Sequence, residues 1–198
     1  VYLPYFSFDS DTVSDYLIEI GYRNPDGGDI DYKPRKGSYK RPFAGITVFA
    51  SSKTQNDLIK KIGDFLPSSI QPFDPDYMAG YYAERNSMTL KHVFEIVQYK
   101  ITGDLNTLIP EHALREFNGD KYQNLRFKTQ YSNTNYKYIL APFYLAAVTY
   151  KGKKYDVVIN GVSGEVACSV PFARKKIITL LIILGIIAAA VLIAFIAF

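Results

Sequence analysis

Two aspartates near the start of the chain have the type and spacing that phosphoryl-transfer chemistry uses. Asp9 and Asp11 follow an apolar segment and precede Thr12 and Val13. One carboxylate of such a pair can act as a nucleophile and the second as acid and base, with a magnesium ion between protein and phosphate. The pair therefore defines an enzymatic hypothesis, which further residues would have to complete.

The segment 8–13 resembles the first motif of the haloacid-dehalogenase phosphatases. That resemblance implies a Ser or Thr after a second strand, a Lys, and a Gly-Asp pair followed by another acid. The pairs Gly63-Asp64 and Gly103-Asp104 are not followed by that acid. A phosphatase stays an alternative, and an Asp-rich turn at 9–12 is the simpler interpretation.

Other catalytic and metal-binding patterns are incomplete. Val13 and Ser14 stand where a calcium loop needs an oxygen ligand and a glycine. Glu165 occupies the second glycine position of a nucleophile elbow, and no P-loop or dinucleotide fingerprint is present. One cysteine, Cys168, and two histidines are too few for a cysteine-rich zinc site, and we expect the cysteine to be buried. We therefore expect no catalytic or metal-ligating residues and no cofactor within this sequence.

A basic and aromatic cluster lies in the segment 24–41, which we expect to be an exposed polar loop because it contains several Pro and Gly residues. Such residues can contact lipid headgroups or an acidic protein, or they can stack on bases and neutralise phosphates. A plain solvated loop is the simplest interpretation, lipid or partner contact the functional one, and a nucleic-acid-binding module a further alternative. The cations concerned are Lys33, Arg35, Lys36, Lys40 and Arg41.

The last part of the chain predicts a membrane anchor. Ile177 to Phe198 carry no charge, and a helix of this length covers roughly 33 Å, enough for a hydrocarbon core of about 30 Å. The cations Arg174, Lys175 and Lys176 precede it, and positive charge resists translocation. No apolar leader opens the chain, which also favours the cytoplasmic side for the N-terminal part. We expect a cytosolic domain over 1–173, and a basic flank and single transmembrane helix over 174–198.

The pattern of the first 173 residues predicts one α+β domain with a largely antiparallel sheet and packed helices. The 17 Tyr and 13 Phe favour strands. Alternation indicates strands at 1–8, 16–22, 43–50, 125–131 and 136–150, and a closing meander over 136–168. Helical spacing indicates helices near 54–66, 75–82, 89–101 and 111–117.

Three blocks of the chain resemble a bacterial family of membrane-anchored proteins with an N-terminal zinc ribbon, often labelled as related to primosomal protein N′ or to a transcription-factor zinc ribbon. The opening block consists of Pro4, Tyr5, Phe8, Asp9, Asp11 and Thr12. The middle block consists of Pro72, Phe73, Asp74, Pro75, Tyr77, Ala79, Gly80, Tyr81, Ala83 and Glu84. The end block consists of Tyr138, Leu140, Pro142, Tyr150, Lys151, Gly152, Lys153, Tyr155, Val158, Asn160, Gly161, Ser163, Gly164, Glu165 and Pro171.

The resemblance implies a four-cysteine zinc ribbon, then this domain, then one or more membrane spans. Because this sequence lacks the ribbon cysteines, we expect zinc only in a preceding N-terminal segment. Some such proteins occur beside flotillin-like and phage-shock membrane-stress proteins, which implies an adaptor. The helicase label has no support here, because no nucleotide-binding motif is present.

These observations lead to one functional hypothesis. We expect a non-catalytic, membrane-anchored scaffold or adaptor that organises a protein assembly at the cytoplasmic face of a membrane. Its expected partners are lipids and membrane-associated proteins, including flotillin-like or phage-shock proteins, and not nucleic acid. The sequence leaves the oligomeric state open.

Overall fold

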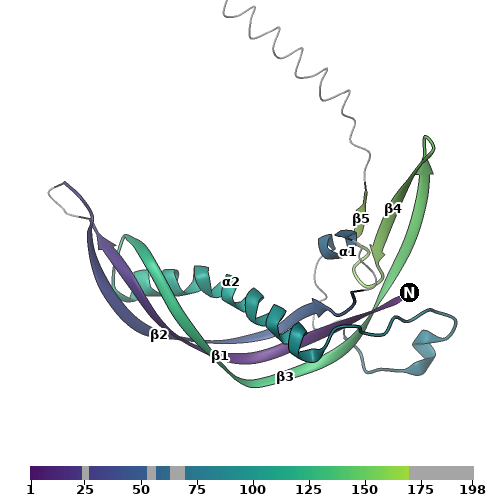
Figure 1. Cartoon of the computed structure of the whole chain (residues 1–198), viewed down its shortest axis with the longest axis horizontal. Coiled ribbons are helices and arrows are strands. Elements are labelled where there is room, and N and C mark those ends of the chain that lie inside the picture. The colour runs from purple at the N-terminus through teal and green to yellow at the C-terminus, as the bar shows by residue number, and fades with distance from the viewer. Residues whose placement is uncertain (24–26, 53–56, 63–69, 170–198) are drawn as a thin grey trace, which may run out of the picture.

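A computed structural model describes residues 1–23, 27–52, 57–62 and 70–169. These residues form a five-stranded antiparallel sheet in the order β2-β1-β3-β4-β5 (Figure 1). Strands hold 53% of the described residues and helices 23%, so the sheet dominates the fold. The strands are β1 (Tyr2–Tyr22), β2 (Asp31–Phe49), β3 (Lys121–Tyr150), β4 (Lys153–Asn160) and β5 (Val166–Cys168). The helices are α1 (Asp57–Lys61), the 3-10 helix η2 (Pro75–Met78) and α2 (Leu90–Glu116).

Strand β3 changes its neighbour part-way along its length. Its residues from Lys121 to Pro142 pair with β1, and its residues from Phe143 to Tyr150 pair with β4 on the opposite edge. The hairpin of β3 and β4 therefore extends beyond the start of β1 and projects from the rest of the sheet (Figure 1).

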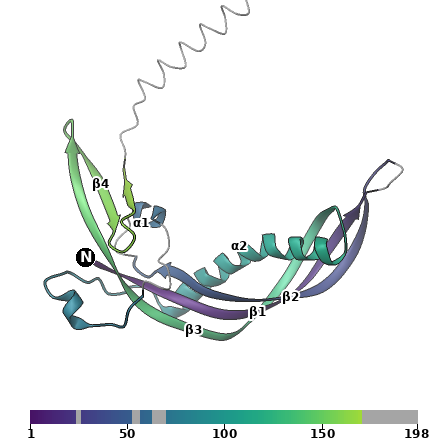
Figure 2. The same ribbon diagram turned by 180° about the vertical axis from the view of Figure 1, so that it is seen from behind.

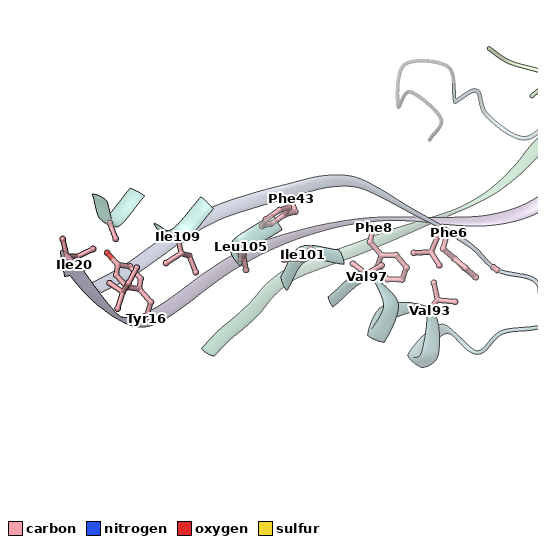
Figure 3. Packing of buried hydrophobic residues seen from close by; sticks show 14 residues of the cluster. Phe6, Phe8, Tyr16, Ile20, Phe43, Val93, Val97, Ile101, Leu105 and Ile109 are labelled. Carbon is pink, nitrogen blue, oxygen red and sulfur yellow. The ribbon is translucent and has the colours of Figure 1, made fainter. Parts of the chain in front are cut away.

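Helix α2 covers one face of the three long strands. Its buried side chains recur every four residues, which places them on one stripe of the helix. They pack on alternate residues of β1, including Phe6, Phe8 and Tyr16, as Figure 3 shows. Burial of each Val, Ile or Leu side chain of the helix stripe contributes about 1.5–3 kcal/mol. The stripe consists of Val93, Val97, Ile101, Leu105, Ile109 and Ala113.

A second, smaller core lies on the other face of the sheet. Leu3 and Tyr5 alternate with Phe6 and Phe8 along β1, so they point to the face opposite α2. There they pack with Phe143, with Val158 of β4, and with α1. In the reversed view α1 lies beside β4 and β5, whereas α2 follows the long strands (Figure 2). The first third of β1 is consequently covered on both faces.

The structure corrects the predicted fold class. An α+β domain followed by a transmembrane helix was expected, but the described residues form a mostly antiparallel sheet. Among them, no helix has the length and apolar composition that crossing a membrane requires. The predicted span at 177–198 and its basic flank, Arg174, Lys175 and Lys176, lie outside the described residues. The membrane location that depended on this span is therefore not retained.

Several predicted boundaries are wrong because long strands tolerate local irregularities. The turn expected at 9–12 is part of β1 and lies beside bulges of its neighbours β2 and β3, and most of the loop expected at 24–41 belongs to β2. Pro34 is accommodated because β2 is an edge strand, where its missing N–H faces solvent. Gly37 lies against the ring of Tyr16, where a larger residue would collide. Cys168, expected to be buried, is exposed.

Two helices expected at 89–101 and 111–117 are one continuous helix. Thr89 accepts a hydrogen bond from the backbone N–H of His92 and so begins α2 as its N-cap. Pro110 lies inside the helix and is buried. The apolar stripe on both sides of Pro110 outweighs the one backbone hydrogen bond that this residue cannot donate.

Candidate functional site

The candidate site is an apolar cavity of about 560 Å³ beside the edge of β3. One wall is the stretch Tyr138–Pro142, in which five successive residues line the cavity. Because side chains alternate between the faces of a strand, such a continuous lining means that the backbone edge itself bounds the cavity. The remaining walls are Tyr2 of β1, the segment Ile70, Gln71, Pro72, Phe73, Asp74, Tyr77 and Met78, and Val162 in the β4–β5 turn.

The wall opposite β3 is a loop that β1 holds in place. The hydroxyl of Tyr2 donates a hydrogen bond to the backbone carbonyl of Tyr77 at 2.8 Å. The Tyr2 ring meets the ring of Tyr81 edge-on, with centroids 6.2 Å apart. The backbone of Tyr2 also exchanges hydrogen bonds with Tyr82 and Glu84. The loop is thus fixed next to the start of the sheet.

Local chemistry shapes this loop. The Asp74 carboxylate accepts the backbone N–H of Asp76 at 3.0 Å, and Pro75 occupies the first helical position, so η2 begins here. Gly80 then adopts a φ of 81°, a conformation that glycine accepts at little cost. This turn returns the chain toward β1.

The cavity is lined mainly by carbon and has an exposed aromatic rim. Phe73 is 68% exposed, Tyr77 54% and Tyr138 45%. Exposed aromatic side chains around an apolar cavity are typical of sites that bind other molecules. Within the described ranges, no group of three or more His, Cys, Asp or Glu side chains is arranged to hold a metal ion. The arrangement is suited to binding an apolar group.

The two aspartates of the phosphatase-like motif have structural partners. Asp9 accepts the backbone N–H of Gly45 at 2.8 Å, and Asp11 accepts the side-chain amide of Asn133 at 2.8 Å. Gly45 and Asn133 have positive φ and lie where the register of β1 against its neighbours shifts. Both carboxylates therefore support β-bulges in the middle of an antiparallel sheet.

A third acid of β1 has the same role. Glu19 accepts the side-chain amides of Gln123 and Asn124, at 2.7 and 2.9 Å, where β3 shifts register again. Asn124 has a φ of 53°, which asparagine tolerates better than most residues. Three acids of β1, Asp9, Asp11 and Glu19, thus lie at the irregular positions of its neighbours and accept hydrogen bonds there.

The predicted basic cluster is divided by the alternation of β2. Lys33, Arg35 and Arg41 lie on the α2 side, over the rings of Tyr22, Phe117 and Phe43, at 5.4–5.7 Å from the ring centroids. Lys36 and Lys40 point to the opposite face, because their positions alternate with those of the other three. They lie beside Leu17 and Val13 of β1, whose β3 partners are Arg126 and Gln130. None of the five lines the cavity.

Two tyrosines with raised pKa values, Tyr16 and Tyr131, lie under α2. Burial, together with a hydrogen bond to Glu116, raises the pKa of Tyr16, and burial raises the pKa of Tyr131. Neither residue lines the cavity, so these shifts concern the stability of the sheet and not the candidate site.

Reasoning from the sequence missed the cavity. The middle block and its tyrosines were assigned to a short helix, and its surroundings in space were not predicted. A usable signal was present: aromatic residues are concentrated between two prolines and a glycine, a pattern typical of an ordered, exposed loop.

Comparisons with known proteins give one informative match. The chain is 29% identical over 136 residues to the "Uncharacterized protein YdjG" of Bacillus subtilis (strain 168). The match covers 68% of this chain and 39% of that protein, so the chain spans well under half the length of this relative. No family model and no solved structure matches the chain.

Proposed function

We propose that this chain is a non-catalytic adaptor that binds an apolar segment of a partner protein in the cavity beside β3. The observation that carries the proposal is the cavity itself, which combines a carbon-rich lining, an aromatic rim and the edge of β3. Its volume falls within the range of about 300–1,000 Å³ typical of ligand sites, enough for two or three large side chains.

The chemistry of the lining supports a protein ligand over a charged metabolite. Asp74 is the one lining residue with a formal charge among those that the structure describes. A phosphate or carboxylate would find no cation among the described lining residues to offset its loss of hydration. Aromatic side chains such as Phe73 and Tyr138 are, in contrast, enriched at the centres of protein interfaces.

The phosphatase and nucleic-acid alternatives have less structural support. Asp9 and Asp11 already accept hydrogen bonds that maintain bulges, and the five cations of 33–41 lie on two faces of β2. Proteins of the flotillin-like or phage-shock type, which the family resemblance implies, are our proposed source of the bound segment. The zinc ribbon that the resemblance implies would belong to a preceding segment and takes no part in this site.

Peptide selection tests the proposal. The full chain is immobilised and a displayed library of random twelve-residue peptides is selected on it. We expect the selected peptides to bind at least about tenfold more weakly to Phe73→Ala, since an aromatic anchor commonly contributes more than about 1.4 kcal/mol.

The matched control is Tyr99→Ala, which removes a ring that is 81% exposed on α2 and outside the cavity. This variant should bind the same peptides as the unmodified chain does. Equal loss in the two variants, or a selection that yields no peptide, would show that the cavity is not a peptide site.

A further inference from the structure

We propose that the bound segment is an extended strand that pairs with the free edge of β3 at Tyr138 and Leu140. This inference rests on the proposed function and specifies the conformation of the partner. Three observations support it. They are the alternating direction of the backbone hydrogen-bonding groups of β3, the charges and bulges that protect the rest of that edge against strand pairing, and the position of the cavity.

The first step is the direction of the backbone groups. Val1 and Phe143 exchange two hydrogen bonds, each of 2.8 Å, so they form a hydrogen-bonded pair. In an antiparallel ladder such pairs alternate with pairs that exchange no bonds. The pairs Pro4–Leu140 and Phe6–Tyr138 are therefore of the second kind, and Pro4 has no N–H to donate in any case.

The N–H and C=O groups of Leu140 and Tyr138 consequently point away from β1, toward the opposite edge of β3. Pro142, the next alternate residue after Tyr138 and Leu140, confirms this direction. Its carbonyl accepts the backbone N–H of Gly161 at 2.8 Å on that edge. Strand β4 pairs only with residues 143–150, so in the described part of the chain the edge before Pro142 has no strand partner.

The second step is the contrast with the rest of this edge. Exposed strand edges are normally protected against pairing by charges and bulges. From Lys121 to Lys137, β3 carries four cations and two bulges with Asn124 and Asn133 at positive φ. The stretch from Tyr138 to Pro142 carries no charge and no bulge. The unprotected part of the edge is the part that borders the cavity.

The third step is the fit between edge and cavity. Tyr138 and Leu140 share a face with Tyr2, and the loop that holds Phe73 and Tyr77 lies over that face. An added strand would place its side chains opposite Tyr138 and Leu140 on this face, inside the cavity, and the residue between them on the other face. Strand addition of this kind takes affinity from main-chain bonds and specificity from pockets for alternate side chains.

The experiment uses the peptides selected on the full chain. We expect apolar residues at alternate positions, i and i+2, because only those side chains would enter the cavity. A set of variants of one peptide, each with a single backbone N-methyl group, should then show a period of two. Methyl groups at alternate residues should weaken binding at least about tenfold, and those at the intervening residues should change it less than about threefold.

Amide hydrogen exchange of the protein gives an independent measurement. Peptide binding should slow exchange at Tyr138 and Leu140, whereas Ile139 and Ala141, already bonded to β1, should change little. A helical i, i+3, i+4 pattern in the peptides, N-methyl effects without a period of two, or unchanged exchange at Tyr138 and Leu140 would overturn strand addition. If Phe73→Ala still weakened the binding of those peptides, the proposed adaptor function would stand without strand addition.

Discussion

Removal of the Asp9 carboxylate separates a structural role of this residue from a catalytic one. In Asp9→Ala the half-buried N–H of Gly45 loses its acceptor, and the bulge of β2 at Gly45 loses its support. Hydrogen bonds to charged groups contribute about 1.5–3 kcal/mol. Because both residues are partly exposed, we expect the low end, a free energy of unfolding reduced by about 1.5 kcal/mol.

Urea unfolding followed by far-UV circular dichroism measures this effect. With a slope of about 2 kcal/mol per molar urea, the midpoint should fall by about 0.75 M. Asp9→Asn keeps an acceptor oxygen and should lose less than half as much. Asp104→Ala, an exposed acid on α2, is the matched control and should stay within about 0.5 kcal/mol of the unmodified protein.

Two results would refute this reasoning. If Asp9→Ala were as stable as the Asp104→Ala control, the bond to Gly45 would not support the bulge. If the protein hydrolysed phosphate esters and Asp9→Asn abolished the reaction, the carboxylate would be a nucleophile, as the phosphatase hypothesis requires.

Two further predictions concern the core beneath α2. Ile101→Ala should lower the free energy of unfolding by about 2–5 kcal/mol because Ile101 is fully buried; an effect below 1 kcal/mol in chemical denaturation would contradict the packing of α2 on the sheet. Since burial and the bond to Glu116 raise the pKa of Tyr16, the folded state holds this proton more tightly than the unfolded chain. The contribution of the protonated Tyr16 side chain to the free energy of unfolding should be complete below about pH 10 and should decline above it by up to about 1.4 kcal/mol per pH unit. Denaturation series at different pH measure this decline, which Tyr16→Phe should reduce.

The sequence predicted local periodicity better than the length of the elements. The alternation of Leu125 to Tyr131 and the apolar run of 136–150 were recognised, and they form parts of β3. Their continuity was not predicted, and Asn133 between them adopts positive φ within a bulge. Continuity of this kind depends on the neighbouring strand, which local sequence does not specify.

The candidate site was not predictable for a related reason. The cavity brings together Tyr2, the loop at 70–78 and the edge at 138–142, which lie far apart in sequence. Asp9 and Asp11 drew attention because their spacing resembles a motif, whereas in the structure both carboxylates accept hydrogen bonds from neighbouring strands. Proximity in sequence directed attention to these two residues, whereas the cavity depends on proximity in space.

The position of the cavity follows from the change of partner along β3. Up to Pro142 the strand uses one edge to pair with β1, and from Phe143 it uses the other edge to pair with β4. A strand that exchanges neighbours in this way leaves an unpaired edge just before the exchange, because the second neighbour has not yet begun. The loop around η2 covers one face at that point and supplies the apolar wall. Among the described residues, an unpaired strand edge and a pocket for side chains therefore meet at one place, which is the combination that recognition of an extended segment requires.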